Sequence, residues 1–256
     1  MKLTVYLKLK YNVFQKDVAY KGYVRTILDM AYEVYYKFRL KKMGVTFPDY
    51  SRNLELTNEK SVNKDCHENT TSSFYMLSKA FSKLPLKRNR IRMLDIGCGA
   101  GRALAFGMQQ SFEQVSGIDL DEPALEQAMI NCRNMQQHGS NTAFSIMRMD
   151  ATTCYIPDTV NVVYLYNPFG MKTMQDVVDN IMQHMENRKE DLYIIYSNPT
   201  YRELFNAYPV CNKIFQSSYK DINRADMSIF RIKSKIERTI TKAMLLWEGG
   251  FQLILE

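Results

Sequence analysis

A glycine-rich segment, Met93–Arg102 (MLDIGCGAGR), constrains the fold of this chain more than any other feature. It follows a short apolar run and precedes a helical pattern. Gly97, Gly99 and Gly101 allow a tight turn and a close approach of a ligand to the backbone, and the helix N-terminus offers free N–H groups. Asp95 stands two residues before the first glycine, where its charge repels a pyrophosphate but can pair with an α-ammonium group. The motif therefore predicts a strand-turn-helix unit that binds an amino-acid-bearing cofactor.

Short apolar runs and helical periodicity alternate from this motif to about residue 196. Such alternation is typical of β-α-β units around a mainly parallel sheet. After Pro209, two apolar runs flank the polar stretch 220–226, which predicts an antiparallel hairpin at the sheet edge. We expect an α/β fold: a doubly wound, mostly parallel seven-stranded sheet with a C-terminal antiparallel hairpin, preceded by an N-terminal helical extension. The expected strands are 92–96, 115–120, 144–149, 160–166, 192–196, 213–219 and 227–232, and the expected helices among them are 103–110, 124–135 and 174–185.

The N-terminal part is predicted to hold one amphipathic helix over residues 18–42. We expect its apolar stripe to pack on the main domain, although its tyrosines and basic neighbours also suit a partner or a membrane surface. The stripe consists of Val24, Ile27, Leu28, Ala31, Val34, Tyr35 and Phe38.

Residues 43–68 lack sustained periodicity and mark a connection. A second helix is expected from Thr70 to Leu84, with Thr70, Thr71 or Ser72 as its N-cap. The expected division is a helical extension or lid over 1–68, the α/β domain over 69–239, and a tail of unassigned role over 240–256.

The charge is unevenly placed. Residues 1–45 hold ten Lys or Arg against three acids, whereas the remaining residues hold 24 of each. A basic segment can attract the phosphates of nucleic acid or of anionic lipid, but it is also the ordinary solvated face of a helix.

Composition excludes several classes of protein. No apolar run approaches the roughly 18 residues of a membrane-spanning helix, and the first residues lack the pattern of a signal peptide, which predicts a cytoplasmic protein. The five cysteines form no CxxC pair, so we expect reduced thiols. His67, His138 and His184 lack metal-ligand spacing, and no metal site is expected.

A second acid follows at the spacing that a doubly wound fold uses for binding ribose. The strand Gln114–Leu120 places Asp119 about 20 residues beyond the glycine turn. The alternative role for Asp119 is the N-cap of the next helix, for which Asp121 competes. We expect Asp119 to hold ribose hydroxyls.

With these residues in place, the sequence resembles the class I S-adenosylmethionine-dependent methyltransferases over about residues 70–235. The resemblance implies S-adenosyl-L-methionine as cofactor and S-adenosyl-L-homocysteine as product. It places Asp95 near the cofactor's amino group and Asp119 on the ribose, and makes Asp150 the candidate for the adenine amino group. Asp150 as a simple turn residue is the alternative. The cofactor-binding set implied is Asp95, Gly97, Cys98, Gly99, Gly101, Asp119, Leu120, Asp150, Ala151 and Asn167.

The fourth strand ends in Tyr166-Asn167-Pro168-Phe169, at the position where this family places residues beside the transferred methyl. Carboxyl ends of strands line the ligand crevice in such sheets independently of the resemblance. Asn167 can accept N–H bonds from an amine, and an aromatic ring can stack on a planar acceptor or face a sulfonium. We therefore take Asn167 and Phe169 as candidate catalytic residues, and Tyr166, Pro168 and Phe169 as candidate substrate contacts. The alternative is that Asn-Pro simply ends the strand.

Two further resemblances bear on the acceptor without fixing it. The tetrapeptide is similar to the Asn/Asp-Pro-Pro-Tyr/Phe motif of methyltransferases acting on planar nitrogens, but has one proline where that motif has two. It is distantly similar to the Asn-Asn-Phe segment of non-SET histone lysine methyltransferases. On the fifth strand, Tyr196 and Asn198 are further candidate substrate contacts, although Asn198-Pro199 also suits a plain turn.

Three functions stay open on these grounds. A small-molecule or glycan methyltransferase is favoured, because the basic excess lies in one helix and no RNA-binding motif is visible. A nucleic-acid or protein N-methyltransferase would use the basic residues 1–45. A non-catalytic binding module or an NAD-dependent oxidoreductase would share the glycine turn, but Asp95 suits NAD badly and no Tyr-xxx-Lys constellation is present.

Overall fold

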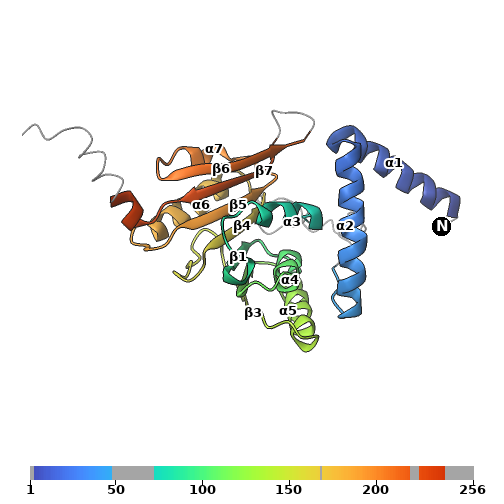
Figure 1. Cartoon of the computed structure of the whole chain (residues 1–256), viewed down its shortest axis with the longest axis horizontal. Helices are drawn as coiled ribbons and strands as arrows, with labels where there is room; N and C mark the ends of the chain where they lie inside the picture. The colour runs from blue at the N-terminus through green and yellow to red at the C-terminus, as the bar shows by residue number, and fades with distance from the viewer. Residues whose placement is uncertain (1–2, 48–71, 168, 220–224, 240–256) are drawn as a thin grey trace, which may run out of the picture.

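The structure is a computed structural model that describes residues 3–47, 72–167, 169–219 and 225–239 (Figure 1). Several sequence predictions lie wholly or partly outside these residues, among them the boundary near residue 68, the caps Thr70 and Thr71, Pro168, the hairpin turn 220–226 and the tail 240–256.

The core of the molecule is one seven-stranded sheet with the strand order β3-β2-β1-β4-β5-β7-β6. The first five strands run parallel, whereas β7 pairs antiparallel with both β5 and β6. The predicted fold, with its antiparallel hairpin at the sheet edge, is confirmed. The strands are β1 (Arg92–Ile96), β2 (Gln114–Asp119), β3 (Ala143–Arg148), β4 (Val162–Tyr166), β5 (Leu192–Ser197), β6 (Cys211–Ser218) and β7 (Ala225–Ile232).

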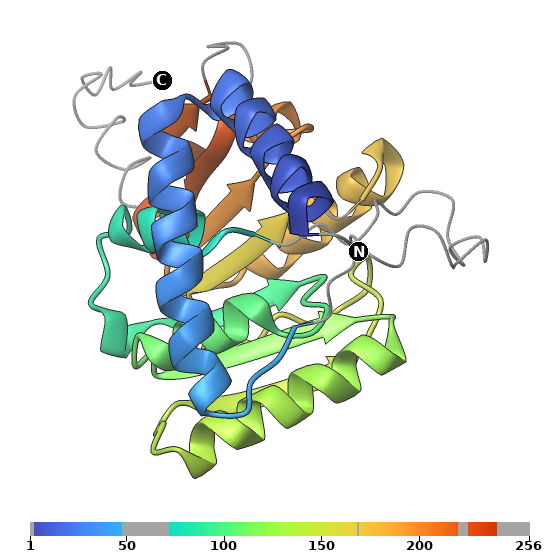
Figure 2. The ribbon, with the colours of Figure 1, turned by 90° about the vertical axis from the view of Figure 1, so that its right-hand side faces the viewer.

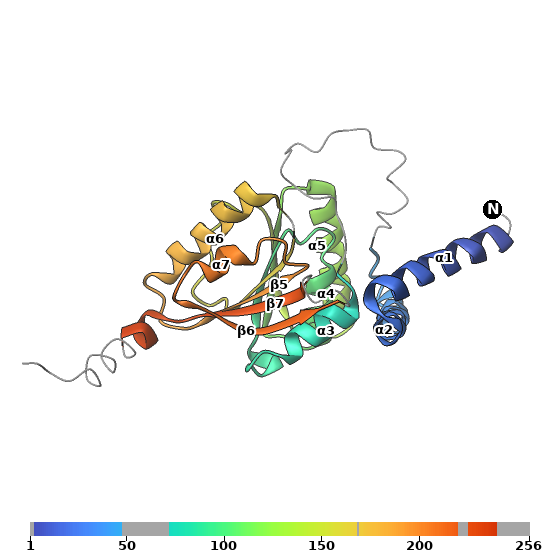
Figure 3. The same ribbon diagram turned by 90° about the horizontal axis from the view of Figure 1, so that it is seen from above.

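Helices cover both faces of the sheet (Figure 3). One face carries α3 (Phe74–Ser82), α4 (Arg102–Gln109) and α5 (Glu122–Gln137), and the other carries α6 (Met171–Met185) and α7 (Glu203–Asn206). A short 3-10 helix, η2 (Arg88–Arg90), leads into β1. Two buried apolar clusters result, one on each side, as expected where a central parallel sheet buries both of its faces.

The N-terminal extension forms two helices where the sequence predicted one. α1 (Leu3–Lys21) and α2 (Tyr23–Lys42) are separated at Gly22, whose φ of 91° suits glycine but no ordinary helical residue. α1 runs away from the start of α2 at a wide angle (Figure 1 and Figure 2), and the two helices contact one another. None of the helices in the described ranges is long and apolar enough to cross a membrane.

The orientation of α2 corrects a second expectation. The buried positions are Thr26, Asp29, Tyr36 and Leu40, so the face that meets the domain is polar in its N-terminal half and apolar in its C-terminal half. The predicted apolar stripe points away from the domain; Val24 and Val34 are 72% and 70% exposed. Specific polar contacts in the N-terminal half of the helix, together with the burial of Tyr36 and Leu40, decide which face packs on the domain.

Those polar contacts tie α2 to the domain along its length. Arg25 donates to Asp226 of β7 at 3.0 Å, and Asp29 accepts from the Ser73 hydroxyl at 2.9 Å. Glu33 accepts from the backbone N–H of Phe74 at 3.1 Å and pairs with Arg102 at the start of α4. The extension is thus docked by buried and half-buried charges.

The chain beyond α2 is also held. The Asn131 side chain of α5 accepts from the Thr46 N–H at 3.0 Å and donates to the Thr46 carbonyl at 2.8 Å. Its amide also donates to the Ala100 carbonyl at 3.0 Å, so one buried residue links the extension to the glycine turn.

The N-cap of α3 differs from the prediction. Ser73 occupies this position and accepts from the Met76 N–H at 3.1 Å. The Ser72 hydroxyl is buried and bonds to the phenol of Tyr164 instead, while Thr70 and Thr71 lie outside the described residues. A buried hydrogen-bond partner thus takes Ser72 away from the helix end.

Candidate functional site

The glycine turn joins β1 to α4 and is held from β2. The N–H groups of Gly97 and Cys98 donate to the Ile118 carbonyl at 2.9 and 3.0 Å. Gly99 has a φ of 50°, and a Cβ built there would meet nothing within 4 Å, so the turn opens outward at this residue. A Cβ on Gly101 would lie 3.0 Å from the Ala128 side chain. The open position leaves room for a ligand, and the closed one lets α4 pack on α5.

The Cys98 side chain packs inward and leaves only its backbone for a ligand. Its Sγ would lie 2.7 Å from a Cβ placed on Gly117 of β2. The glycine at 117 therefore makes room for this sulfur. Burial raises the pKa of Cys98 well above its ordinary value, which keeps the thiol protonated and unreactive.

Asp95 occupies the fourth position of β1 and is 4% exposed. No residue in the described part of the chain donates a hydrogen bond to its carboxylate. Burial, followed by the negative charge of Asp119, raises the pKa of Asp95 to about 8. A buried carboxylate without a partner is costly, and a cation supplied by a ligand would remove that cost.

Asp119, at the end of β2, is organised by backbone donors. Its carboxylate accepts from Gly99 N–H at 2.7 Å, Leu120 N–H at 2.7 Å and Asp121 N–H at 3.0 Å. A carboxylate has about four acceptor sites, so at least one remains for a hydroxyl. The N-cap of α5 is Asp121, which accepts from Ala124 N–H at 3.2 Å. Asp119 is thus free of the capping role.

Asp150 follows β3 and forms a local turn. Its carboxylate accepts from both the N–H and the hydroxyl of Thr152 at 2.8 Å. Ala151 is buried, whereas Leu120 is 45% exposed beside Asp119. These residues lie after parallel strands β2 and β3, so all three are at the carboxyl edge of the sheet that carries the glycine turn.

At the end of β4, Asn167 is held by a tyrosine from the neighbouring strand. The Tyr196 hydroxyl donates to Asn167 Oδ1 at 3.1 Å, and Tyr201 N–H donates to that hydroxyl at 3.4 Å. Asn167 has a φ of 37°, a left-handed conformation that asparagine tolerates better than most residues. Tyr196 itself is fully buried, so it can reach a substrate only by positioning Asn167.

The neighbours of Asn167 fall in different surroundings. Phe169 is half-buried against the apolar cluster that includes α6. Burial raises the pKa of Tyr166, with further contributions from nearby Tyr20 and Asp29, so this phenol lies near the N-terminal helices. Pro168 lies outside the described residues. The site at the end of β4 therefore borders the extension, as a lid would require.

Asn198, after β5, is a turn residue of the same kind as Asn167. It has a φ of 48°, and its N–H donates to the Asp226 carbonyl at 2.9 Å. Because the Asp226 carboxylate also pairs with Arg25 of α2, Asn198 lies close to an ion pair that ties the extension to the domain.

Sequence reasoning did not single out Arg102, which links three parts of the site. Its guanidinium pairs with Glu33, donates to the Ser72 carbonyl at 2.7 Å and lies 4.0 Å from the centroid of the Phe74 ring. Its position directly after the third glycine was the available signal.

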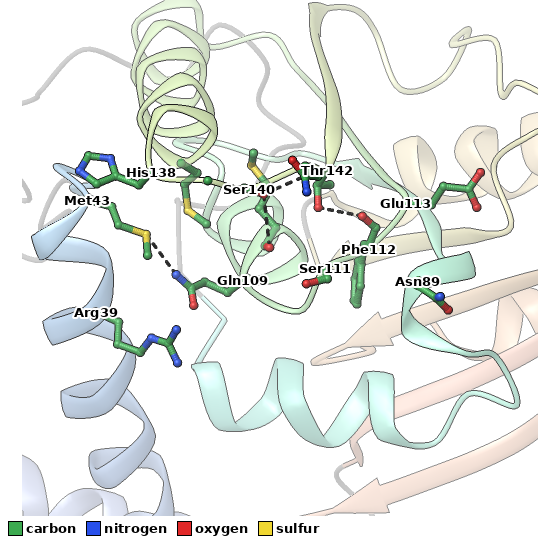
Figure 4. A pocket seen from close by; sticks show the side chains of 14 residues that line it. Arg39, Met43, Asn89, Gln109, Ser111, Phe112, Glu113, His138, Ser140 and Thr142 are labelled. Carbon is green, nitrogen blue, oxygen red and sulfur yellow. Dashed lines mark hydrogen bonds between the residues drawn. The ribbon is translucent and has the colours of Figure 1, made fainter.

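A cavity of about 410 Å³ lies away from these residues (Figure 4). It is lined by the C-terminal ends of α2, α4 and α5, including Arg39, Gln109 and His138. The glycine turn and Asp121 stand at the N-terminal ends of α4 and α5, so this cavity is at the opposite edge of the sheet. This cavity is therefore not part of the candidate active site.

The described residues contain no candidate metal site. No group of three or more His, Cys, Asp or Glu is placed to hold an ion within those ranges. His138 and His184 stand at the C-terminal ends of α5 and α6, away from the carboxyl edge, and His67 lies outside the described residues.

The sheet order, the glycine turn and the acids Asp95 and Asp119 on neighbouring strands are typical of a Rossmann-like domain, a fold that commonly binds nucleoside-containing cofactors at the carboxyl edge of its sheet. Residues 93–188 match the family described as "Methyltransferase domain". The match supports a class I S-adenosylmethionine-dependent methyltransferase domain in this part of the chain.

A curated relative is the ubiquinone biosynthesis O-methyltransferase of Alkalilimnicola ehrlichii, which is 31% identical over 86 residues. The match covers 28% of this chain and 34% of that protein, so the chain spans about a third of the length of the curated relative it matches.

Two solved structures are similar to this chain at low identity. A candidate methylase of Haemophilus influenzae is 11% identical with a TM-score of 0.47, covering 60% of this chain and 94% of its own. A candidate rRNA methylase of Clostridium thermocellum is 14% identical with a TM-score of 0.47, covering 64% and 99%.

Proposed function

We propose that the protein transfers a methyl group from S-adenosyl-L-methionine to a small-molecule or glycan acceptor, releasing S-adenosyl-L-homocysteine. The observation that carries the proposal is Asp95, a buried carboxylate beside an open glycine turn that receives no hydrogen bond from any residue within the described ranges. An α-ammonium group is the partner that this environment lacks, and a pyrophosphate cofactor such as NAD would add a second negative charge there.

The other residues fit the same cofactor. Asp119 keeps an acceptor site for a ribose hydroxyl, and the open face at Gly99 admits the methionine end against the backbone of Gly97 to Gly101, including Cys98. Leu120, Asp150 and Ala151 at the same edge would surround the adenine. The Asp150 carboxylate is shared with Thr152, so we propose it as an adenine contact through its second oxygen.

The cofactor supplies an electrophilic methyl group on a sulfonium. This chain's part is alignment, and proximity alone is worth roughly 7–11 kcal/mol of barrier in favourable cases. Asn167, fixed by Tyr196, would orient the acceptor through its side-chain amide and contact the cofactor, while Tyr166 and Phe169 would pack on both. Tyr196 and Asn198 would shape the pocket from β5. We keep Pro168 as a proposed contact on sequence grounds.

Two arginines near the end of β4 bear on the acceptor class. Arg25 pairs with Asp29 and Asp226, and Arg102 pairs with Glu33, so the charge of each arginine is already balanced by a carboxylate. This supports a small molecule or glycan over nucleic acid at the transfer site. We further propose that residues 1–68 form the lid over the methyltransferase domain, 69–239, with 240–256 as a tail.

A cytoplasmic location is also part of the proposal. It is supported by Cys98, Cys132, Cys154 and Cys211, which are all free thiols, as expected in a reducing compartment.

The first test is calorimetric titration of the full chain with S-adenosylmethionine, with NAD in a parallel titration. We expect micromolar binding that Asp95→Asn and Asp119→Asn each weaken by tenfold or more. Asp121→Asn is the matched control, because asparagine caps a helix as well as aspartate and the residue adjoins the site. Binding of NAD in preference, or no binding to the wild type, would overturn the assignment.

The second test addresses the acceptor. Release of S-adenosylhomocysteine is measured with panels of phenols, amines, sugars and tRNA. Turnover confined to tRNA, with affinity falling steeply as salt rises, would replace the proposed acceptor class by nucleic acid without touching the cofactor assignment.

A further inference from the structure

The outer face of α2 is an apolar surface that no described residue covers. The exposed residues recur at helical spacing, so they form one stripe along the helix, opposite the face that docks on the domain. The stripe includes Val24 (72% exposed), Ile27 (43%), Met30 (52%), Val34 (70%) and Phe38 (62%).

The charges around this stripe are of one sign. The acids of α2, Asp29 and Glu33, both face the domain and pair there with Arg25 and Arg102. The only acid of α1, Asp17, pairs with Lys21 at 3.4 Å. No acid is therefore available on the outer face of α2 to neutralise a basic side chain.

Basic residues gather at the C-terminal end of the stripe. Arg39, Lys41 and Lys42 are exposed, and none forms an ion pair with a residue in the described ranges. Lys42 Nζ lies 4.3 Å from the centroid of the Phe38 ring, so its stem lies along the apolar surface while its charge remains in water.

We propose that the outer face of α2 binds an anionic lipid surface. An amphipathic helix with aliphatic and aromatic residues on one side and lysines at its border lies in the lipid interface and gains from both burial and anionic headgroups. A second copy of the chain would match the apolar stripe but bring its unpaired cations against those of the first. Nucleic acid would match the cations but leave Val24, Ile27 and Val34 without a partner.

This proposal is independent of the methyl-transfer reaction, because the residues of the stripe are on the opposite side of α2 from Asp29 and Glu33. A protein held in this way would meet acceptors at the lipid surface.

The test is co-sedimentation of the full chain with vesicles of phosphatidylcholine alone and of phosphatidylcholine with phosphatidylglycerol. We expect binding to the anionic vesicles that weakens as salt rises. The variant Val24→Gln/Val34→Gln/Phe38→Gln should lose at least about tenfold in affinity for the vesicles, since it removes apolar side chains that the lipid would bury. Lys41→Gln/Lys42→Gln should also lose about tenfold or more.

The control is Lys189→Gln/Lys213→Gln, which removes the same charge from exposed lysines outside the extension and should bind as the wild type does. Equal binding to both vesicle types, or equal loss in the control, would overturn the proposal. So would a dimer in light scattering that the triple glutamine variant dissociates, which assigns the stripe to a second copy, or binding to RNA but not to vesicles.

Discussion

The Tyr196 hydroxyl on β5 donates a hydrogen bond to Asn167 Oδ1 at the end of β4, and the two atoms are 3.1 Å apart. The bond joins a fully buried ring to a half-buried amide held in a left-handed backbone conformation. The strongest candidate for the transfer residue is thus set by the neighbouring strand and not by its own loop.

Tyr196→Phe should remove this bond and leave the cofactor contacts intact. We expect the free energy of unfolding to fall by about 0.5–1.5 kcal/mol, the usual net value of one hydrogen bond. The affinity for S-adenosylmethionine should change less than threefold, while turnover with any acceptor found should fall more. Urea denaturation and calorimetry measure the first two. A tenfold loss of cofactor affinity would show that Asn167 has a different role.

The stability of the free protein should depend on pH through Asp95. Its pKa of about 8 lies above the unfolded value, so the folded state binds the extra proton and stability falls as pH rises from about 4 to about 8. Asp95→Asn has no such proton. The free energy of unfolding of the variant, relative to that of the wild type, should therefore rise across this window by up to about 1.4 kcal/mol per pH unit. Above the window this difference should stay constant. Denaturation midpoints at pH 5, 7 and 9 test this; a constant difference would contradict it.

Cofactor binding should release a proton from the same carboxyl group. At pH 7 Asp95 is mostly protonated in the free protein, and pairing with an ammonium group requires the charged form. The calorimetric enthalpy should therefore vary with the ionisation enthalpy of the buffer. Asp95→Asn, studied at the higher concentration that its weaker binding requires, should show a smaller variation. The same slope for both proteins would assign the proton to another group.

Gly117→Ala should destabilise the domain, because the new Cβ would lie 2.7 Å from Cys98 Sγ and 2.9 Å from Leu104 Cδ1. Overpacking of this kind costs about 1–3 kcal/mol. The double variant Cys98→Ala/Gly117→Ala should lose less free energy of unfolding than the two single variants lose in sum, since removal of the sulfur makes room for the methyl group. Additive losses would place the strain elsewhere.

The docking of α2 should depend on Arg25. Asp226 is 1% exposed and loses its closest cation in Arg25→Gln, while Lys79, at 3.9 Å, and the Ser217 hydroxyl still contact its carboxylate. We expect the free energy of unfolding to fall by about 1.5–3 kcal/mol, the usual value of a hydrogen bond to a charged group, and the extension to open to protease. Lys37→Gln on the same helix removes an exposed pair with Glu33 and should cost less than about 1 kcal/mol. Equal effects would mean that charge alone, and not burial, holds the helix.

Much of the fold could be read from local pattern. β1 begins and ends where predicted, and the other six strands lie within two residues of their predicted bounds, because short apolar runs between turns have few other structures available. The glycine turn and the two acids were equally visible, since their spacing along the chain is itself the signal. The placement of the Asp121 cap needed the structure, because both Asp119 and Asp121 had the right chemistry.

The sequence by itself determined the alternation of strands and helices and the chemistry at the strand ends, because these depend on neighbours along the chain. Only the tertiary structure decided which face of α2 meets the domain. The apolar stripe pointed to one answer, but Asp29 and Glu33 have partners in Arg25, Ser73, Phe74 and Arg102, and three of these come from residues distant in sequence. Buried charges cost more when unpaired than an exposed apolar stripe does, so the face that carries Asp29 and Glu33 docks inward, together with Tyr36 and Leu40 of the core.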